Sequence, residues 1–419
     1  MNQFLVAIAI AIIPFISSAQ KNLLIQGKVI QKSNSEAIQW ASISIKNRPL
    51  GTVSGKDGSF EFHFSADYTN DEFMISHIGF KTYTIKVKDA VAMGNTIYYL
   101  EEDSVNLPEI HVLAKQLTAH QIIKKAISAV QKNYPTTPFA LDAFYRDYKK
   151  VNGEYVSLLE AAVSIYDPGY ARKSGSEQVT VDEIRRSKRY INEYEGFVSQ
   201  LNLLKSLLGL NDVKHRRNRA LGQPEPNYIL DETTILDNEF VYVISTNGIK
   251  KFKIYIRASN YAILRIEQDT DYRNINHVNN YKANDSVFFK ITSIQSYLDF
   301  KPYNNKLYLN YMNYSWTTEN INTKTNKVIN TTYFYQELMP NLIMTDNVQP
   351  PPPNTLMADT TLEIQTKKYN SAFWAQYNMV TQNPADEQIL QDLSKDVSTP
   401  FEKTDAANLP KSKKKKRSN

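Results

Sequence analysis

Apolar and polar residues alternate one by one in the first quarter of the chain. Phe60, Phe62 and Phe64 alternate with polar residues directly after the run Lys56-Asp57-Gly58. A period of two is that of a β-strand with one buried face, and Asp followed by Gly favours a tight turn. We therefore expect a hairpin here whose second strand buries an aromatic face.

The same alternation recurs at short intervals from residue 22 to residue 113. It predicts further strands at 23–29, 40–45, 73–78, 82–87, 97–100 and 110–113. About seven strands in about 90 residues are typical of a β-sandwich. The sequence therefore predicts such a sandwich over residues 20–114.

A helical period is clearest directly after the predicted sandwich. Thr118 and Gln121 have the spacing of a capping box, and apolar residues from Ile122 to Val130 then recur at helical spacing opposite lysines. Tyr134-Pro135 ends the pattern. We expect an amphipathic helix that packs on a sheet, with a membrane-surface helix as the alternative.

Strand patterns return and dominate residues 139–334. Segments 143–151 and 154–166 are joined by Asn152-Gly153, a strong signal for a two-residue hairpin turn. Further strands are predicted at 228–236, 240–245, 251–257, 262–269, 287–300, 306–317 and 328–334. We expect an α+β domain over residues 115–345 with a large curved antiparallel sheet, and a mainly β protein as a whole.

Residues 197–210 are rich in leucine and precede a basic cluster that includes Lys214 and Arg216. This pattern favours a surface helix with a solvated loop, and a lid over a cavity is the alternative. Beyond the last strand, the run Pro350-Pro351-Pro352-Pro353 indicates an extended linker. We expect a Pro-rich linker and a terminal helical segment over residues 346–397.

The net charge of +6 comes from the end of the chain. Six cations without an acid among them lie at Lys411 and from Lys413 to Arg417, and the remaining chain has equal numbers of acids and bases. Residues 398–419 are therefore predicted to be a disordered basic tail. A solvated tail is favoured over one that binds anionic lipid, and no nucleic-acid partner is expected.

The first 19 residues carry no charged side chain and hold an apolar run from Phe4 to Ile16, followed by Ser17-Ser18-Ala19. Such a run is short for a membrane span and suits a cleaved signal peptide, with an uncleaved anchor as the alternative. No later segment is apolar enough to span a bilayer. The sequence has no cysteine, which excludes disulfides and thiolate metal sites.

Four short motifs in the predicted sandwich occur in a characteristic order. They are Gln26-Gly27-Lys28-Val29, Ala41-Ser42-Ile43, the segment from Gly51 to Phe60, and His77-Ile78-Gly79-Phe80. With these motifs in this order, the region resembles the carboxypeptidase-regulatory-like domain. The resemblance implies a prealbumin-like (transthyretin-like) sandwich of the kind found in bacterial envelope proteins and outer-membrane receptors.

The resemblance carries no catalytic residue over to this chain. We interpret Gly58 and Gly79 as turn glycines, and Phe60 and Phe80 as core residues. None of the six histidines has a carboxylate three residues later, the spacing that a zinc carboxypeptidase site needs. We therefore expect no metal, no cofactor and no catalytic residue.

The second domain offers one further resemblance and one candidate pocket. The adjacent strands 253–257 and 261–267 resemble those of lipoprotein-carrier-like half-barrels of the bacterial envelope. Five aromatic residues of two later strands are candidates for a pocket that binds an apolar or sugar ligand: Tyr297, Phe300, Tyr311, Tyr314 and Trp316. Pairing across strands within a core is the alternative for them.

These observations favour an exported, non-enzymatic binding or carrier module, in the periplasm or at the outer-membrane periphery of a two-membrane bacterium. Its ligand or partner would be lipid-like, otherwise apolar, or an envelope protein held on the concave side of the sheet. A hydrolase of envelope polymers with carboxylates not located in the sequence, and a purely structural interaction protein, are the alternatives.

Overall fold

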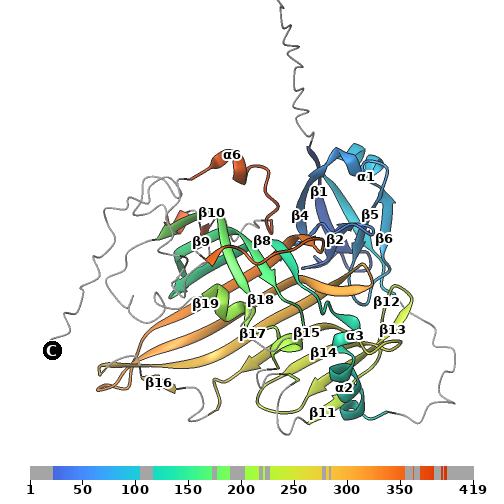
Figure 1. The fold of residues 1–419 in the computed structure, drawn as a ribbon. Coiled ribbons are helices and arrows are strands. Elements are labelled where there is room, and N and C mark those ends of the chain that lie inside the picture. Colours follow the sequence, from blue (N-terminus) through green and yellow to red (C-terminus); the bar gives the residue numbers. More distant parts are fainter. Residues whose placement is uncertain are drawn as a thin grey trace, which may run out of the picture.

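The computed structural model describes a large part of the chain, and Figure 1 shows its arrangement. The predicted signal peptide (1–19), the strand at 110–113 and the basic tail (398–419) lie outside the described residues. The described residues are 22–103, 117–171, 177–188, 203–216, 220–221, 227–275, 280–282, 285–353, 362, 369–381, 388–389 and 391–393.

The N-terminal part is a sandwich of two small sheets. One has the order β4-β1-β7 and the other β3-β2-β5-β6. A short 3-10 helix, η1 (Ala66–Tyr68), and one helix, α1 (Val87–Met93), complete it. The strands are β1 (Asn22–Gln31), β2 (Ser42–Ile45), β3 (Gly51–Val53), β4 (Ser59–Ser65), β5 (Glu72–Ser76), β6 (Tyr83–Lys86) and β7 (Thr96–Leu100).

The predicted hairpin around Lys56-Asp57-Gly58 is wrong, although its buried aromatic face is present. Strand β3 pairs with β2 in one sheet, whereas β4 pairs with β1 in the other. The turn therefore carries the chain from one sheet to the other. Alternation along β4 indicates which side is buried, but it does not identify the partner strand.

The second part is one sheet of twelve strands with the order β10-β9-β8-β19-β18-β17-β15-β14-β13-β11, with β12 paired to β13 and β16 paired to β17. The expectation of a mainly β protein with a large antiparallel sheet is confirmed. The strands are β8 (Phe139–Val151), β9 (Glu154–Asp167), β10 (Gln178–Lys188), β11 (Tyr228–Leu230), β12 (Thr234–Leu236), β13 (Glu239–Thr246), β14 (Phe252–Arg257), β15 (Ile263–Asp271), β16 (Asn280–Lys282), β17 (Val287–Tyr303), β18 (Lys306–Asn322) and β19 (Val328–Met344).

Two local predictions in this part are confirmed. Asn152 and Gly153 both have positive φ and join β8 to β9, as a type I′ turn requires. Helix α2 (Ala119–Ser128) begins with a complete capping box between Thr118 and Gln121. A short helix, α3 (Val130–Asn133), follows it.

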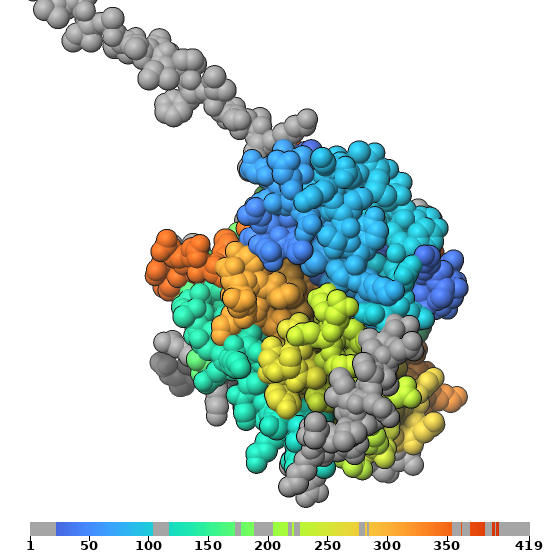
Figure 2. Space-filling model, turned by 90° about the vertical axis from the view of Figure 1, so that its right-hand side faces the viewer, coloured from blue at the N-terminus to red at the C-terminus, as the bar shows by residue number. Residues whose placement is uncertain are grey.

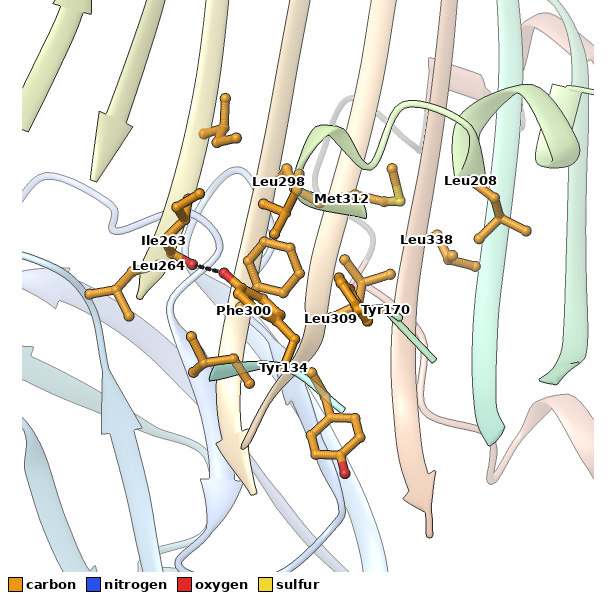
Figure 3. Packing of buried hydrophobic residues seen from close by; sticks show 14 of the residues in the cluster. Tyr134, Tyr170, Leu208, Ile263, Leu264, Leu298, Phe300, Leu309, Met312 and Leu338 are labelled. Atoms are coloured by element: carbon orange, nitrogen blue, oxygen red, sulfur yellow. Dashed lines mark hydrogen bonds between the residues drawn. The ribbon is translucent and has the colours of Figure 1, made fainter. Parts of the chain in front are cut away.

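Helices cover one face of the large sheet, which we call the inner face. The apolar side of α2 packs there, together with α4 (Leu203–Leu208) and α5 (Asp212–His215). Figure 3 shows part of this core, in which the Tyr134 hydroxyl donates a hydrogen bond to the Ile263 carbonyl. The predicted packing of the amphipathic helix on a sheet is therefore present.

The sandwich sits on the opposite face, which we call the outer face (Figures 1 and 2). Leu50 pairs with Leu342 of β19 in an isolated bridge, and the Ile343 amide donates to the Pro49 carbonyl at 2.9 Å. At the other end, the Gly79 amide donates to the Ile235 carbonyl at 2.9 Å. The two parts of the molecule are thus joined at two separate points.

A C-terminal segment completes this junction. Its short helix α6 (Ser371–Trp374) buries Trp374 in a cluster with residues of β3, β8, β17, β18 and β19. The side chain of Asn378 bonds both backbone groups of His63, accepting from the amide at 2.7 Å and donating to the carbonyl at 2.9 Å. Residues of the predicted linker region are therefore part of the packed structure.

Candidate functional site

The loop before β2 forms the centre of the junction between the sandwich and the outer face. The buried Ser54 hydroxyl donates to the Ile38 carbonyl at 2.6 Å and accepts from the Ala41 amide at 2.9 Å. The Trp40 amide donates to the Ser54 carbonyl at 2.9 Å. These three bonds fix the loop and point the Trp40 indole at the sheet.

Trp40 has a φ of +56°, which is rare for a bulky side chain and costs on the order of 1–3 kcal/mol. Its ring packs on Tyr297 of β17 at 4.5 Å and on Tyr311 of β18 at 5.6 Å between centroids. Among the described residues, neither the Trp40 Nε1 nor the Tyr297 hydroxyl has a hydrogen-bond partner. Two buried polar atoms are therefore left without a protein partner beside the same junction.

Both residues belong to the wall of a large cleft. It has a volume of about 1320 Å³ and lies between the sandwich and strands β13 to β19 of the outer face. The wall combines aromatic rings with side chains that can donate or accept hydrogen bonds. Its aromatic members are Trp40, Phe80, Tyr255, Tyr297, Tyr333 and Tyr335, and its amides and hydroxyls include Gln31, Thr234, Ser245, Gln295, Asn313 and Ser315.

The charged residues of the cleft wall include the buried Arg265. Arg265 lies over the Tyr297 ring at 4.7 Å and contacts Asp299 at 3.2 Å. Burial raises the pKa of Asp299, and the Arg265 guanidinium opposes that rise. Burial and the nearby Arg265 charge lower the pKa of His77 well below its usual value, so its ring is neutral at pH 7.

A buried network of charges lies further along the outer face. Glu160 contacts Arg146 at 2.7 Å and Arg185 at 2.5 Å. Arg146 also contacts Glu337 at 2.9 Å, and the Tyr311 hydroxyl donates to Glu337 at 2.7 Å. Burial favours a raised pKa for Glu160, but the two guanidinium groups outweigh it and lower that pKa.

A smaller pocket of about 310 Å³ borders this network, and we call it the tyrosine pocket. Tyr148, Tyr155, Tyr333 and Tyr335 line it, together with Trp40 and Lys56. The Lys56 ammonium lies 4.5 Å from the centre of the Tyr335 ring. Since Trp40, Lys56, Tyr333 and Tyr335 also line the cleft, the two cavities have a common wall.

The five aromatic residues proposed as a pocket from the sequence do not lie together. Tyr297 and Tyr311 face the sandwich, whereas Phe300 belongs to the core on the inner face. Tyr314 packs against that inner core, and Trp316 stacks on Phe334 at 4.6 Å. Strand alternation and the irregular register between Asp299 and Phe300 distribute them over two faces.

The four residues singled out in the sandwich shape its backbone or pack in its core. Gly58 and Gly79 have φ of +84° and +89°, and a Cβ on Gly58 would lie 2.3 Å from the Val29 carbonyl oxygen. Phe60 is buried in the sandwich core, and Phe80 packs against that core while lining the cleft. Trp40 was not singled out, because a positive φ and a contact across domains leave no signal in the sequence.

In the part of the chain that the structure describes, no group of three or more His, Asp or Glu side chains is arranged to hold a metal ion. Within the same residues, every helix is too short or too polar to cross a bilayer.

Comparison with known proteins identifies the sandwich. Residues 25–112 match the model of the CarboxypepD_reg-like domain family. The resemblance drawn from the four motifs is therefore confirmed for this region, about a fifth of the chain. No curated protein matches the chain.

Several solved structures are similar to more than half of this chain. A LolA superfamily protein from Nitrosomonas europaea has 11% identity over 58% of this chain and 99% of its own, with a TM-score of 0.24. A putative outer membrane lipoprotein-sorting protein domain from Vibrio parahaemolyticus has 9% identity over 55% of this chain and 95% of its own, with a TM-score of 0.23. A DUF1329 family protein from Desulfovibrio piger has 9% identity over 56% of this chain and 95% of its own, with a TM-score of 0.22. At these values we draw no functional inference from them.

Proposed function

We propose that this protein is an exported binding module that holds a polar, saccharide-like ligand in the cleft between the sandwich and the outer face of the large sheet. The observation that carries the proposal is the pair of unpartnered polar atoms in the cleft wall, the Trp40 Nε1 and the Tyr297 hydroxyl. Buried polar groups normally have a hydrogen-bond partner, so a ligand that supplies hydroxyl groups would satisfy both.

The composition of the cleft wall supports a sugar more than a lipid. Aromatic faces such as Trp40 and Tyr255 offer flat apolar surface, while neighbouring amides and hydroxyls offer directional hydrogen bonds. A saccharide presents both kinds of surface, C–H groups on its ring faces and hydroxyls on its edges. A hydrocarbon chain would leave the amides and hydroxyls of the wall unpaired.

The inner face is less suited to the apolar ligand expected from the sequence. Ile122 of α2 and Leu204 and Leu207 of α4 are buried at 0–1% exposure in the core on that face. Buried side chains of α2 and α4 thus occupy this face, and displacing a buried Leu or Ile side chain costs roughly 1.5–3 kcal/mol. The proposal therefore places the ligand on the outer face.

A hydrolase would need two carboxyl groups facing each other across a cleft. Among the described residues, burial raises the pKa of three acids, Asp142, Asp167 and Asp299. Each of them is held by another group: Asp142 by the Tyr377 hydroxyl, Asp167 by Lys214 and Asp299 by Arg265. Binding is therefore the function that the described geometry supports best.

The test measures saccharide binding by calorimetry and by tryptophan fluorescence. The probes are soluble glycan fragments prepared from peptidoglycan and from lipopolysaccharide. We expect saturable binding of at least one fragment, and about five- to tenfold weaker binding by Trp40→Phe, which keeps a smaller aromatic ring but removes the N–H donor.

Trp316→Phe is the matched control, because Trp316 stacks on Phe334 and is not part of the cleft wall. It should bind as the unchanged protein does. The proposal is overturned if the folded protein binds none of the fragments, or if the Trp40 and Trp316 variants bind equally well.

A further inference from the structure

A second cavity lies at the other side of Trp40, and we call it the seam cavity. It has a volume of about 810 Å³ and lies between strands β2 and β5 of the sandwich and the end of β17 with the turn that follows it. Its wall is strongly basic. The cations are Lys46, Arg48, Arg257, Arg265, Lys301 and Lys306, against which stand the acids Asp237 and Asp299.

Most of these cations already have an acceptor. Lys46 and Arg48 pair with Glu72 and Asp71 at 2.8 Å, and these two pairs reach solvent. Arg257 pairs with Glu239 at 2.7 Å. Arg265 pairs with Asp299, and Lys306 donates to the Lys132 carbonyl at 2.8 Å.

Lys301 differs from its neighbours in the seam cavity. Its side chain is buried, and among the described residues nothing forms a hydrogen bond or an ion pair with its ammonium group. The nearby Asp299 carboxylate is already engaged by Arg265 at 3.2 Å and by the Asn310 amide at 2.9 Å. The Lys301 charge is therefore left without an anion.

The sandwich leaves space for this ammonium group. A Cβ on Gly51 of β3 would lie 2.9 Å from the Lys301 Nζ and 2.7 Å from the Ile43 carbonyl oxygen. Gly51 has no positive φ, so its backbone conformation does not require a glycine. The missing side chain allows the close approach of the amine.

The electrostatic cost of this arrangement is large. Burial lowers the pKa of Lys301 to about 8, and the Asp299 charge only partly opposes the effect. At neutral pH the amine is still largely protonated. A buried charge without a partner is strongly unfavourable, and pairing it with an anion removes much of that cost.

We propose that the seam cavity binds an anionic group, a phosphate or a carboxylate, that pairs with the ammonium group of Lys301. The hydroxyls of Ser42, Ser44 and Thr84 in the same wall can donate further hydrogen bonds to such a group. This inference does not depend on the saccharide proposal, because it concerns another cavity and another residue.

The experiment uses calorimetry with inorganic phosphate, glucose 6-phosphate and glucuronate as anionic probes and with glucose as the neutral probe. We expect saturable binding of phosphate, of glucuronate or of both, and no binding of glucose in the seam cavity. Lys301→Met should weaken anion binding about 10- to 100-fold, the range expected for a lost charge-assisted hydrogen bond.

Lys46→Met is the matched control. Lys46 lines the same cavity, but it is half exposed and already paired with Glu72, so its loss should leave anion affinity within about twofold. Equal affinities of the Lys301 and Lys46 variants would overturn the proposal, as would the failure of every anion to bind.

A measurement on the unchanged protein covers the case in which the Lys301 variant does not fold. The ¹⁵N resonance of the Lys301 Nζ, assigned in lysine-labelled protein, should shift on addition of the anion that binds and should not respond to glucose. A resonance that no anion affects contradicts the proposal. Gln295→Ala changes a residue that lines the cleft but not the seam cavity, so it should retain anion binding, which separates this test from that of the saccharide site.

Discussion

The two faces of the large sheet have opposite chemistry, although they are made from the same strands. Leu338 of β19 points into an apolar core with helices α2 and α4, while its neighbour Glu337 points into a network of charges and tyrosine hydroxyls. The inner face is thus closed by residues of its own domain. The outer face is covered by the sandwich and the C-terminal segment, and it keeps its cavities.

This difference shows how a single sheet can separate stability from binding. Apolar burial on the inner face is non-directional, so side chains can fill the core there without specific partners. On the outer face, each buried charge needs a specific partner, and a charge without one, such as Lys301, marks a place where a ligand can act. The two faces should therefore respond differently to substitution.

The largest effect is expected from Arg146→Met on the outer face. The change leaves Glu337 and Glu160 without one of their guanidinium partners in a buried site, which should cost about 3–5 kcal/mol of unfolding free energy. Urea denaturation measures the loss. Arg48→Met, which breaks the solvent-exposed pair with Asp71, is the control and should change little. Similar losses of unfolding free energy in both variants would show that the buried network does not stabilise the fold more than an exposed ion pair does.

On the inner face, Leu338→Ala should lower the free energy of unfolding by about 3 kcal/mol, because it leaves a cavity between β19 and the helices. Unlike the loss in the Arg146 variant, this loss should not depend on pH, because it involves no titratable group. Denaturation at neutral and at acidic pH separates the two cases. Val328→Ala, on the exposed part of the same strand, is the control. Its free energy of unfolding should lie within about 0.5 kcal/mol of that of the unchanged protein.

A pH dependence should distinguish Lys301 from the apolar residues of the inner face. Its folded pKa of about 8 lies below the ordinary 10.5, so the unfolded chain binds more protons between these values. Stability should therefore rise with pH in this window, by on the order of 3 kcal/mol relative to Lys301→Met. Unfolding of both proteins from pH 7 to pH 11 measures the difference. A difference that stays constant would show that Lys301 is not desolvated.

The smallest effect concerns the helix that covers the inner face. Thr118→Ala removes the side-chain acceptor for the Gln121 amide and should cost about 1 kcal/mol. Thr118→Ser keeps the hydroxyl and should restore most of the loss. Thermal unfolding followed by circular dichroism measures both variants. A full loss in the Ser variant would show that the methyl group, not the cap, is responsible.

Much of this fold could be predicted from local patterns. The cap at Thr118, the turn at Asn152-Gly153 and the strands of the large sheet depend on residues close together in the sequence. The pairing of β4 with β1 in place of β3 could not be predicted, because alternation does not name a partner strand. The family model matches the sandwich at residues 25–112, the region where the four motifs lie.

The candidate site was harder to predict than the fold. Tyr297 was singled out as part of an aromatic group, and it does line the cleft, but Phe300 of the same strand faces the other way. Lys301 could not be recognised from the sequence, because a lysine within a predicted strand is common. Its importance depends on Gly51 and on the loss of solvent, which arise only when two domains meet.

The bonds between Asn378 and His63 also bear on the order in which the molecule is assembled. A ribosome delivers the sandwich first, and domains generally begin to fold in that order. Yet its contact surface includes Trp374 and Val380, which emerge long afterwards. The sandwich therefore reaches its final surroundings only after residues 374–380 have been delivered, and until then the future binding surfaces stay apart.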